Sequence, residues 1–347
     1  MKQDFVLKIQ EIIANQSTDE RELLLQLKTL LYETEEQHII VKESKSITEL
    51  VAENLTQLNG ASHEGQIIKT GFAEFDKKFG GFGLGEFVVI GGRPSMGKTQ
   101  LLINLSLNIS LTIPVLYFTF DLSEFLLTNR FISSCSSIPV NKILQHNLSE
   151  NEQQVLASIG TEFSKHKIFI NDSYKSSLTA FKAQCKKQVE ENGVQVIVVD
   201  CLQMMSSNRY RNSREHEIGQ ISGALKSIAK DLNVCLIASS QLSRAVESRK
   251  ESKRPQLPDL RESGAIEQDA DKVIFIYRPD YYELLADEFG NSTAGLTEIV
   301  LAKNRNGSLG TINLMRDAHF TNFKDFEDYK NDFSFSKNRL DEIDTPF

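Results

Sequence analysis

A short loop in the first third of the sequence has the residues needed to hold phosphate groups. It reads "GGRPSMGKT", and four residues separate Gly92 from Gly97, Lys98 and Thr99. In such a loop backbone N–H groups surround a phosphate, the lysine reaches the β- and γ-phosphate oxygens, and the hydroxyl ligates Mg²⁺. The strand-like run "EFVVI" before the loop makes a chance glycine turn the weaker interpretation. We therefore expect a nucleoside triphosphate to bind at Gly92, Arg93, Pro94, Ser95, Met96, Gly97, Lys98 and Thr99.

Three further polar residues stand where strand-like runs end. "VLYFTF" is followed by Asp121, "VIVVD" ends at Asp200, and "LIASSQ" ends at Gln241. Ligands of open parallel sheets bind beyond the carboxyl ends of the strands, so we expect these side chains near the phosphate loop. Asp200 suits a carboxylate that orients Mg²⁺ together with Thr99, while a turn or cap role is its alternative.

The alternation of short apolar runs with longer helical patterns predicts an α/β fold with a mainly parallel central sheet. A β-hairpin is expected near the C-terminal end, because "NG" lies between two strand-like segments in "TEIVLAKNRNGSLGTINLM". The runs expected to form parallel strands are 86–92, 115–120, 167–170, 194–200, 234–241 and 271–277.

The ends of the chain differ from this core. Residues 1–44 are expected to form a short helical N-terminal arm, residues 45–66 a linker helix and loop, and residues 323–347 an acidic, largely mobile tail. The linker helix has an apolar face that must dock on its own domain or on a neighbouring subunit. That face consists of Ile47, Leu50, Val51, Leu55 and Leu58.

The composition restricts the class of protein. The chain has 347 residues, 40% of them apolar, and a net charge of −8, which argues against a protein that coats nucleic acid with its whole surface. The four cysteines lack metal-ligand spacing, so we expect free thiols in a reducing cytoplasm. We see neither a signal peptide nor an apolar run long enough to span a membrane, and we expect a cytoplasmic protein without membrane contact.

Four segments of the chain form a pattern when they are taken in order. They are "TGFAEFDKKFGGFGLGEFVVIGGRPSMGKT", "VVDCLQMM", "SSQLSRAVESRKESKRPQLPDLRESGAIEQDAD" and "AKNRNGSLGT". Together they resemble the ATPase domain of DnaB-type replicative helicases, a branch of the RecA-like motors. The resemblance covers roughly residues 45 to 322 and assigns 67–322 to a RecA-like P-loop ATPase domain. It implies ATP and Mg²⁺ as cofactors and a homo-hexameric ring that translocates on single-stranded DNA and unwinds duplex.

The resemblance also implies catalytic roles for individual residues. Lys303 and Arg305 match the basic pair that completes the nucleotide site of the adjacent subunit, although charged residues at a hairpin tip are the plain alternative. Gln241 matches the residue that senses the γ-phosphate, with a buried structural amide as its alternative. Lys98 and Asp121 complete the expected catalytic set, Asp121 standing where the family has a glutamate that activates water.

Single-stranded DNA is expected in a central channel. Arg261, Glu262 and Gly264 of "DLRESG" match residues that line this channel along one strand. Two basic segments, 207–214 and 243–254, follow the magnesium and sensor strands, and we favour phosphate contact over a merely solvated surface. Their candidate DNA-contacting residues are Arg209, Arg211, Arg244 and Arg249.

The sequence departs from the family at two places. Asp121 is one methylene shorter than glutamate, about 1.5 Å of reach, so slow hydrolysis is expected, and Asp121 with Glu124 also matches a helix cap. Only some 45 residues precede the linker helix, which puts contact with primase in doubt and leaves a loader or another replication protein as the expected partner. The alternatives are a RecA-like recombinase and a nucleotide-gated scaffold with little hydrolysis in a mobile-element or phage system.

Overall fold

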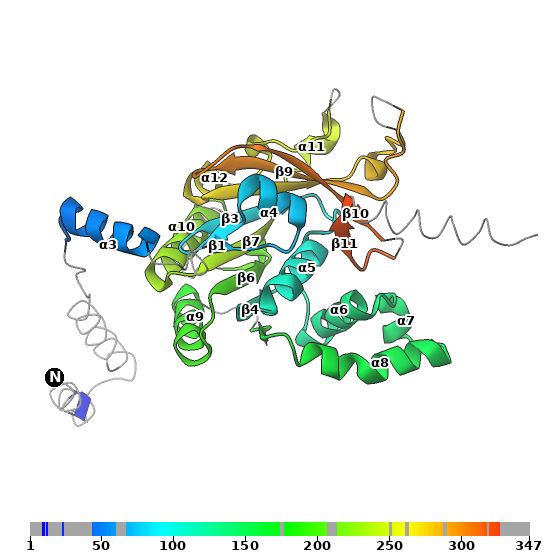
Figure 1. Cartoon of the computed structure of the whole chain (residues 1–347), viewed down its shortest axis with the longest axis horizontal. Coiled ribbons are helices and arrows are strands. Elements are labelled where there is room, and N and C mark those ends of the chain that lie inside the picture. Colours follow the sequence, from blue (N-terminus) through cyan, green and yellow to red (C-terminus); the bar gives the residue numbers. More distant parts are fainter. Residues whose placement is uncertain are drawn as a thin grey trace, which may run out of the picture. The chain divides into compact units, whose positions relative to one another are not determined.

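The structure is a computed structural model, and its chain divides into two compact units, residues 1–63 and 64–347, each described by itself (Figure 1). The described residues are 9, 10, 12, 23, 44–59, 67–173, 177–206, 214–249, 252–260, 264–286, 290–317 and 319–326.

The first unit contains α3 (Ile47–Asn59), a helix within the residues expected to form the linker helix and loop. The helix begins with a reciprocal cap, in which the Glu49 N–H donates to Ser46 Oγ at 3.2 Å and the Ser46 N–H donates to the Glu49 carboxylate at 2.9 Å. The described side chains of its apolar face are exposed, from 39% for Leu50 to 74% for Ile47, and the side chain of Leu58 lies outside the described residues. The helix prediction is therefore confirmed, and Ile47, Leu50, Val51 and Leu55 form an exposed apolar stripe.

The second unit is built on a nine-stranded sheet of strand order β11-β10-β9-β8-β3-β7-β6-β4-β5. The strands from β8 to β5 in this order are parallel, and β9, β10 and β11 add antiparallel pairs at one edge. Their bounds are β3 (Phe87–Gly92), β4 (Val115–Thr119), β5 (Ile168–Asn171), β6 (Val196–Asp200), β7 (Cys235–Gln241), β8 (Lys272–Tyr277), β9 (Leu296–Asn304), β10 (Gly310–Arg316) and β11 (Phe323–Asp325).

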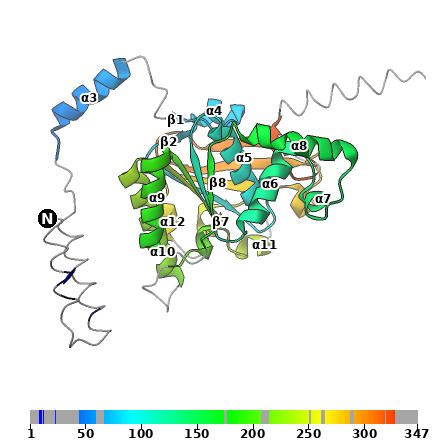
Figure 2. The same cartoon turned by 90° about the horizontal axis from the view of Figure 1, so that it is seen from below.

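Helices cover both faces of this sheet (Figures 1 and 2). Alternate residues of β3 point to opposite faces, so Val88 belongs to one apolar core and Val89 to the other. The first core includes side chains of α4 (Ala73–Phe79), α5 (Lys98–Ser110) and α6 (Glu124–Ser136), with α7 (Val140–Leu144) and α8 (Glu150–Phe163) following α6. The second core includes side chains of α9 (Leu178–Asn192), α10 (Arg214–Leu232), α11 (Ala245–Ser248) and α12 (Gly264–Asp269).

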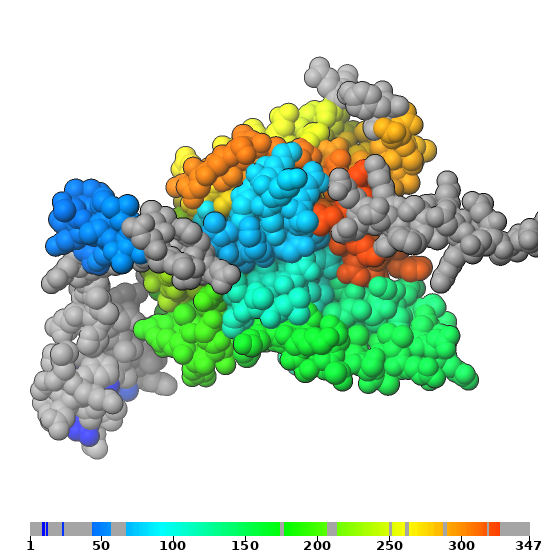
Figure 3. All heavy atoms as spheres, in the orientation of Figure 1, coloured from blue at the N-terminus to red at the C-terminus, as the bar shows by residue number. Residues whose placement is uncertain are grey.

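Short elements complete the unit. They are the antiparallel pair β1 (Ile67–Ile68) and β2 (Phe82–Gly83), and the 3₁₀ turns η1 (Leu202–Met204), η2 (Leu257–Asp259) and η3 (Asp280–Tyr282). Helix α4 (blue) lies beside the hairpin of β9 and β10 (orange) in Figure 3. Lys78 Nζ of α4 donates to the Thr311 carbonyl of β10 at 2.8 Å.

The predicted α/β fold, its parallel strands and its C-terminal hairpin are confirmed. One boundary differs, because β11 lies in residues assigned to the tail and Phe323 is buried in the core. The rest of the tail and nearly all of the arm lie outside the described residues. All four cysteines are free thiols. Over the described residues, none of the helices has the length and apolar character needed to cross a lipid bilayer.

Candidate functional site

The phosphate loop connects β3 to α5, as the motif predicts. Gly97 precedes the helix with φ +98°, a conformation that glycine adopts without strain, and Lys98 and Thr99 begin the helix. Lys98 Nζ donates to the carbonyls of Gly92 at 2.9 Å and Arg93 at 3.1 Å. Burial lowers the pKa of Lys98 against the opposing charge of Asp200. The lysine and the helix N-terminus thus present donors to an anion at this loop.

A pocket of about 430 Å³ brings together most of the residues predicted from strand ends. Its wall includes Lys98, Thr99, Asp121, Asp200 and Gln241. Pro94, Ser95 and Gly97 contribute from the loop itself. The parallel sheet explains the convergence, because Gly92 and Gln241 are register partners in β3 and β7 and Thr119 and Asp200 are partners in β4 and β6.

Not every loop residue faces the pocket. Among the loop's residues, all of which the structure describes, Gly92, Arg93 and Met96 do not line it. The Arg93 side chain instead binds Glu247 at 2.8 Å and the Leu242 carbonyl at 2.9 Å. The hydrogen bond from Arg93 to Glu247 lowers the pKa of the Glu247 carboxyl. Arg93 therefore ties the phosphate loop to the segment that follows β7.

Asp200 and Thr99 fit the requirements of Mg²⁺. Asp200 is buried at the end of β6 and accepts hydrogen bonds from Ser239 Oγ at 2.5 Å and the Tyr117 hydroxyl at 3.2 Å. Burial raises the pKa of Tyr117 well above its ordinary value, so its hydroxyl stays a donor. Mg²⁺ favours oxygen ligands and usually combines one or two protein groups with phosphate oxygens and water. The oriented carboxylate and the helix hydroxyl can supply those protein groups.

Asp121 has an exposed side chain just past β4 and lines the pocket. The alternative interpretation of Asp121 as a helix cap is wrong. Ser123 is the cap of α6, since its hydroxyl accepts from the Leu126 N–H at 3.4 Å. Serine caps a helix as well as aspartate does, and the two candidates stand only two residues apart. Asp121 is thus available for chemistry in the pocket.

Gln241 is held by the 3₁₀ turn after Asp200. Its N–H donates to Gln203 Oε1 at 3.0 Å, and Gln203 Nε2 donates to Ser240 Oγ at 2.9 Å. Leu242 then pairs with Leu260 in an antiparallel bridge. Gln241 is therefore contacted by the turn that precedes the basic segment 207–214, and Leu242 by the residue that precedes Arg261.

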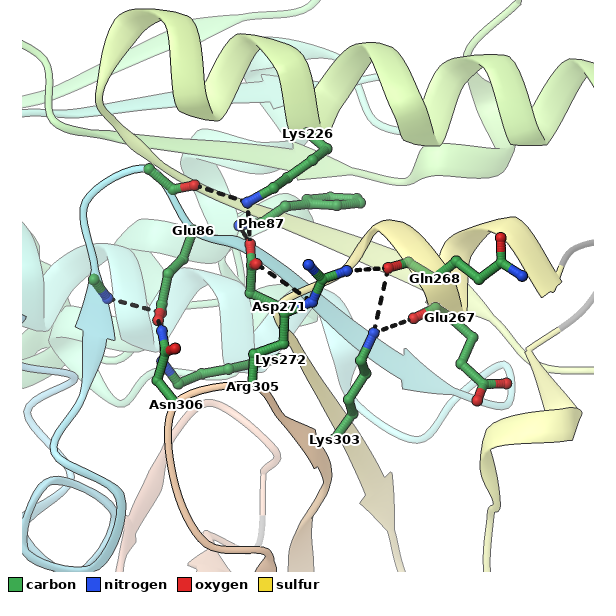
Figure 4. A network of polar contacts seen from close by, with 12 residues as sticks. Glu86, Phe87, Lys226, Glu267, Gln268, Asp271, Lys272, Lys303, Arg305 and Asn306 are labelled. Atoms are coloured by element: carbon green, nitrogen blue, oxygen red, sulfur yellow. Dashed lines mark hydrogen bonds and ion pairs between the residues drawn. The ribbon is translucent and has the colours of Figure 1, made fainter. Parts of the chain in front are cut away.

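Lys303 and Arg305 lie elsewhere (Figure 4). Neither residue, both of which the structure describes, lines the pocket. Lys303 Nζ donates to the carbonyls of Glu267 and Gln268, and Arg305 also donates to the Gln268 carbonyl. The Arg305 N–H donates to the Asp271 carbonyl at 2.9 Å, and Asp271 bonds to Phe87 at the start of β3. The phosphate loop begins at the other end of that strand, so one chain does not bring the pair to its own pocket.

Residues 67–325 match the family model described as DnaB-like helicase C terminal domain. The chain belongs to this family. The match favours the helicase interpretation over the recombinase and the scaffold.

Curated relatives of this DnaB-like chain are named as replicative helicases. A "Probable replicative DNA helicase" of Trieres chinensis is 39% identical over 263 residues, covering 75% of this chain and 57% of the relative. "Replicative DNA helicase DnaC" of Bacillus subtilis is 34% identical over 278 residues, covering 79% of this chain and 60% of the relative. The chain thus spans about three fifths of the curated relatives it matches.

Two solved structures share the DnaB-like fold. One, described as an "ATPase Domain", superposes with a TM-score of 0.75 at 32% identity, covering 82% of this chain and 100% of that chain. "The Structure Of A DnaB-Like Replicative Helicase And Its Interactions With Primase" superposes with a TM-score of 0.76 at 30% identity, covering 94% of this chain and 76% of that chain. The RecA-like core expected from the sequence is confirmed.

The structure of the DnaB-like domain places only part of the predicted DNA-contacting set. Arg244 is exposed before α11, and Gly264 is exposed as the first residue of α12. Arg249 contacts residues of its own chain, because its guanidinium pairs with Asp259 and donates to the Arg254 carbonyl at 3.1 Å. The remaining candidates, Arg209, Arg211, Arg261 and Glu262, lie outside the described residues.

Sequence reasoning missed five residues that line the DnaB-like pocket, which are Gln100, Leu122, Arg130 of α6, Cys201 and Phe320. A Cβ on Gly97 would lie 2.6 Å from Phe320, and the Arg278 guanidinium carbon lies 4.9 Å from the Phe320 ring centroid. Arg278 also donates to the Ser95 carbonyl at 3.1 Å. Arg130 was detectable only as a cation in the helix after Asp121, and Phe320 only as one aromatic near the segment interpreted as a tail.

Proposed function

We propose that this chain is an ATP-dependent DNA helicase of DnaB type, which hydrolyses ATP with Mg²⁺ in a hexameric ring and translocates on single-stranded DNA. The observation that carries the proposal is the separation of two half-sites. Lys98, Asp200, Asp121 and Gln241 converge in one pocket, whereas Arg305 is anchored at the opposite end of β3. Two copies arranged head to tail in a ring would bring both halves together.

The side chains of the pocket divide the work of phosphoryl transfer. Lys98 and the loop N–H groups bind the β- and γ-phosphates, and Thr99 and Asp200 would hold Mg²⁺, which would supply positive charge to the phosphate oxygens. Asp121 accepts a proton from the attacking water as general base. Gln241 contacts the γ-phosphate position and passes its state to the segments after β6 and β7.

An arginine from the adjacent subunit completes the site. Guanidinium groups supplied in trans stabilise charge on the transferred phosphoryl and raise turnover by ~10³ to 10⁵. Arg305 takes this role in our proposal and Lys303 assists it. The positions of Lys303 and Arg305 support a role in trans, because both residues lie on the antiparallel side of the sheet and neither lines the pocket.

The N-terminal residues of the chain are proposed to join the subunits of the ring and to bind its partners. The exposed apolar stripe of α3 supports docking on a neighbouring copy, which would join the subunits. Residues 1–44 are proposed as an arm that recruits a loader or another replication protein. A cytoplasmic location agrees with these partners.

The test of this function measures ATP hydrolysis by the full chain with and without single-stranded DNA, together with strand displacement on a forked duplex. We expect stimulation by DNA, Mg²⁺ dependence and displacement, all lost in Lys98→Ala. ATP turnover that ignores DNA, with intact fork after complete ATP consumption, would contradict the proposal.

A further inference from the structure

Arg305 is anchored on both sides along the chain (Figure 4). Before it, Lys303 donates to two carbonyls of α12. After it, Asn306 Nδ2 donates to Glu86 Oε1 at 3.1 Å, and Glu86 is itself paired with Lys272. The turn between β9 and β10 is therefore held to the body of the domain on both sides of Arg305.

The carbonyls that receive these cations belong to the last turn of α12. The final carbonyls of a helix lack partners within the helix and are often satisfied by lysine or arginine. Glu267 and Gln268 find such partners in Lys303 and Arg305. Burial lowers the pKa of Lys303, and the neighbouring Arg305 charge adds to this. Both side chains thus have a defined direction in place of the free rotation usual at a hairpin tip.

Asp271 connects this arrangement to the rest of the fold. Its carboxylate accepts from the Phe87 N–H at 2.7 Å and from Lys226 Nζ of α10 at 2.6 Å, and it lies 3.7 Å from Arg305 Nε. Its backbone carbonyl accepts from the Arg305 N–H at 2.9 Å. The side chain is only 10% exposed. A buried carboxylate held by partners from β3 and α10 has little freedom to move, so it can fix the guanidinium beside it.

We propose that Asp271 and the last turn of α12 form a cradle that sets the position of Lys303 and Arg305 for the nucleotide of the neighbouring subunit, with Asp271 as the positioning residue. This inference rests on the proposed function, because it needs Arg305 to act in trans. It adds that the geometry of one subunit's catalytic cations is set at α12 and Asp271. The first residue of α12, Gly264, is itself among the residues expected to meet DNA.

The cradle makes a specific kinetic prediction. Asp271→Asn keeps the size of the side chain but removes the charge that faces Arg305 Nε and Lys226. A displacement of about 1 Å at a catalytic group costs up to about 10²-fold, so we expect DNA-stimulated kcat to fall about 10- to 100-fold. The KM for ATP should stay within about threefold, since the nucleotide-binding loop is at the other end of β3. Asp231→Asn is the matched control, because it removes an equal charge from α10, where Asp231 pairs with Lys182 at 2.8 Å, and leaves the Asp271 contacts in place.

Mixed rings distinguish a positioning role in trans from a structural role in the same subunit. Asp271→Asn and Lys98→Ala chains, carrying different tags, are assembled together, and rings that contain both are purified. About one interface in four then combines the intact phosphate loop of an Asp271→Asn chain with the intact cradle of a Lys98→Ala chain. We expect ATP turnover well above the mean of the two parent rings. Mixed Arg305→Ala and Lys98→Ala rings provide the reference.

Each result of these experiments either supports or overturns the cradle. Recovery in both mixtures supports the cradle. Recovery in the Arg305 reference without recovery in the Asp271 mixture overturns the cradle, because Asp271 would then support the phosphate loop of its own chain. Absence of recovery in the reference overturns the trans role of Arg305 and the cradle with it. Unchanged or raised kcat in Asp271→Asn also contradicts it. If Asp271→Asn does not assemble, Asp271→Glu, which keeps the charge and shifts it by one methylene, is measured against the same outcomes.

Discussion

Lys98 and Arg305 lie at opposite ends of strand β3. Lys98 follows the carboxyl end of the strand and faces the pocket, while Arg305 is tied through Asp271 to Phe87 at its amino end. Six residues of parallel strand separate the two ends by roughly 16 Å. A guanidinium at one end cannot stabilise a phosphoryl group at the other. Both residues can take part in one reaction only when two copies of the chain meet.

Arg305→Ala should therefore reduce catalysis and leave nucleotide binding intact. We expect DNA-stimulated kcat to fall by at least about 10³-fold, because the charge on the transferred phosphoryl loses its partner. Binding of a fluorescent ATP analogue to the same protein should be nearly unchanged. Loss of analogue binding in step with turnover would place Arg305 in the binding of its own nucleotide and contradict the account.

Asp121 should be the base, working with shorter reach than a glutamate. Asp121→Asn should lower DNA-stimulated turnover by about 10²- to 10⁴-fold, as expected for loss of a general base. Asp121→Glu should raise turnover, since the carboxylate comes closer to the attacking water. Glu124→Gln, an exposed carboxylate on α6, is the control and should behave like the parent chain. Equal turnover in the Asn and Glu variants would exclude this role.

Ser239 should set the Mg²⁺ requirement through Asp200. Its hydroxyl donates to the buried carboxylate, and loss of such a supporting hydrogen bond typically costs about 10- to 100-fold in metal affinity. We expect Ser239→Ala to need about 10-fold more Mg²⁺ for half-maximal ATP hydrolysis. Ser240→Ala, whose hydroxyl accepts from Gln203 instead, should leave the Mg²⁺ requirement unchanged. A titration that separates neither variant from the parent would refute the assignment of Asp200.

The apolar stripe of α3 should hold the ring together. Leu50→Lys with Leu55→Lys places two charges on the stripe, and burying them against a neighbour would be strongly unfavourable. We expect hexamers to dissociate in mass photometry and ATP turnover to fall with them. Thr56→Lys, on the opposite face of the same helix, should assemble normally. Intact rings in the double variant would show that α3 does not join the subunits.

The sequence was most informative where chemistry depends on neighbours along the chain. The loop before Lys98, the carboxylates that end apolar strands and the "NG" hairpin all follow local rules, and parallel pairing then brings the strand ends together. The sequence did not decide between similar residues that stand close together, as with Asp121 and Ser123 for the cap of α6. Contacts between residues far apart in the sequence could not be predicted from it. Phe320 reaches Gly97 from more than two hundred residues away, and nothing in "DADK" indicates that Asp271 contacts both Phe87 and Arg305.

The most direct test of a nucleotide site shared between two copies is ATP turnover per subunit as a function of protein concentration, measured with single-stranded DNA and alongside mass photometry. A shared site predicts negligible turnover while the chain is monomeric and a rise in turnover per subunit that follows the appearance of rings. Constant turnover per subunit, from concentrations at which only monomers are present, would contradict the account.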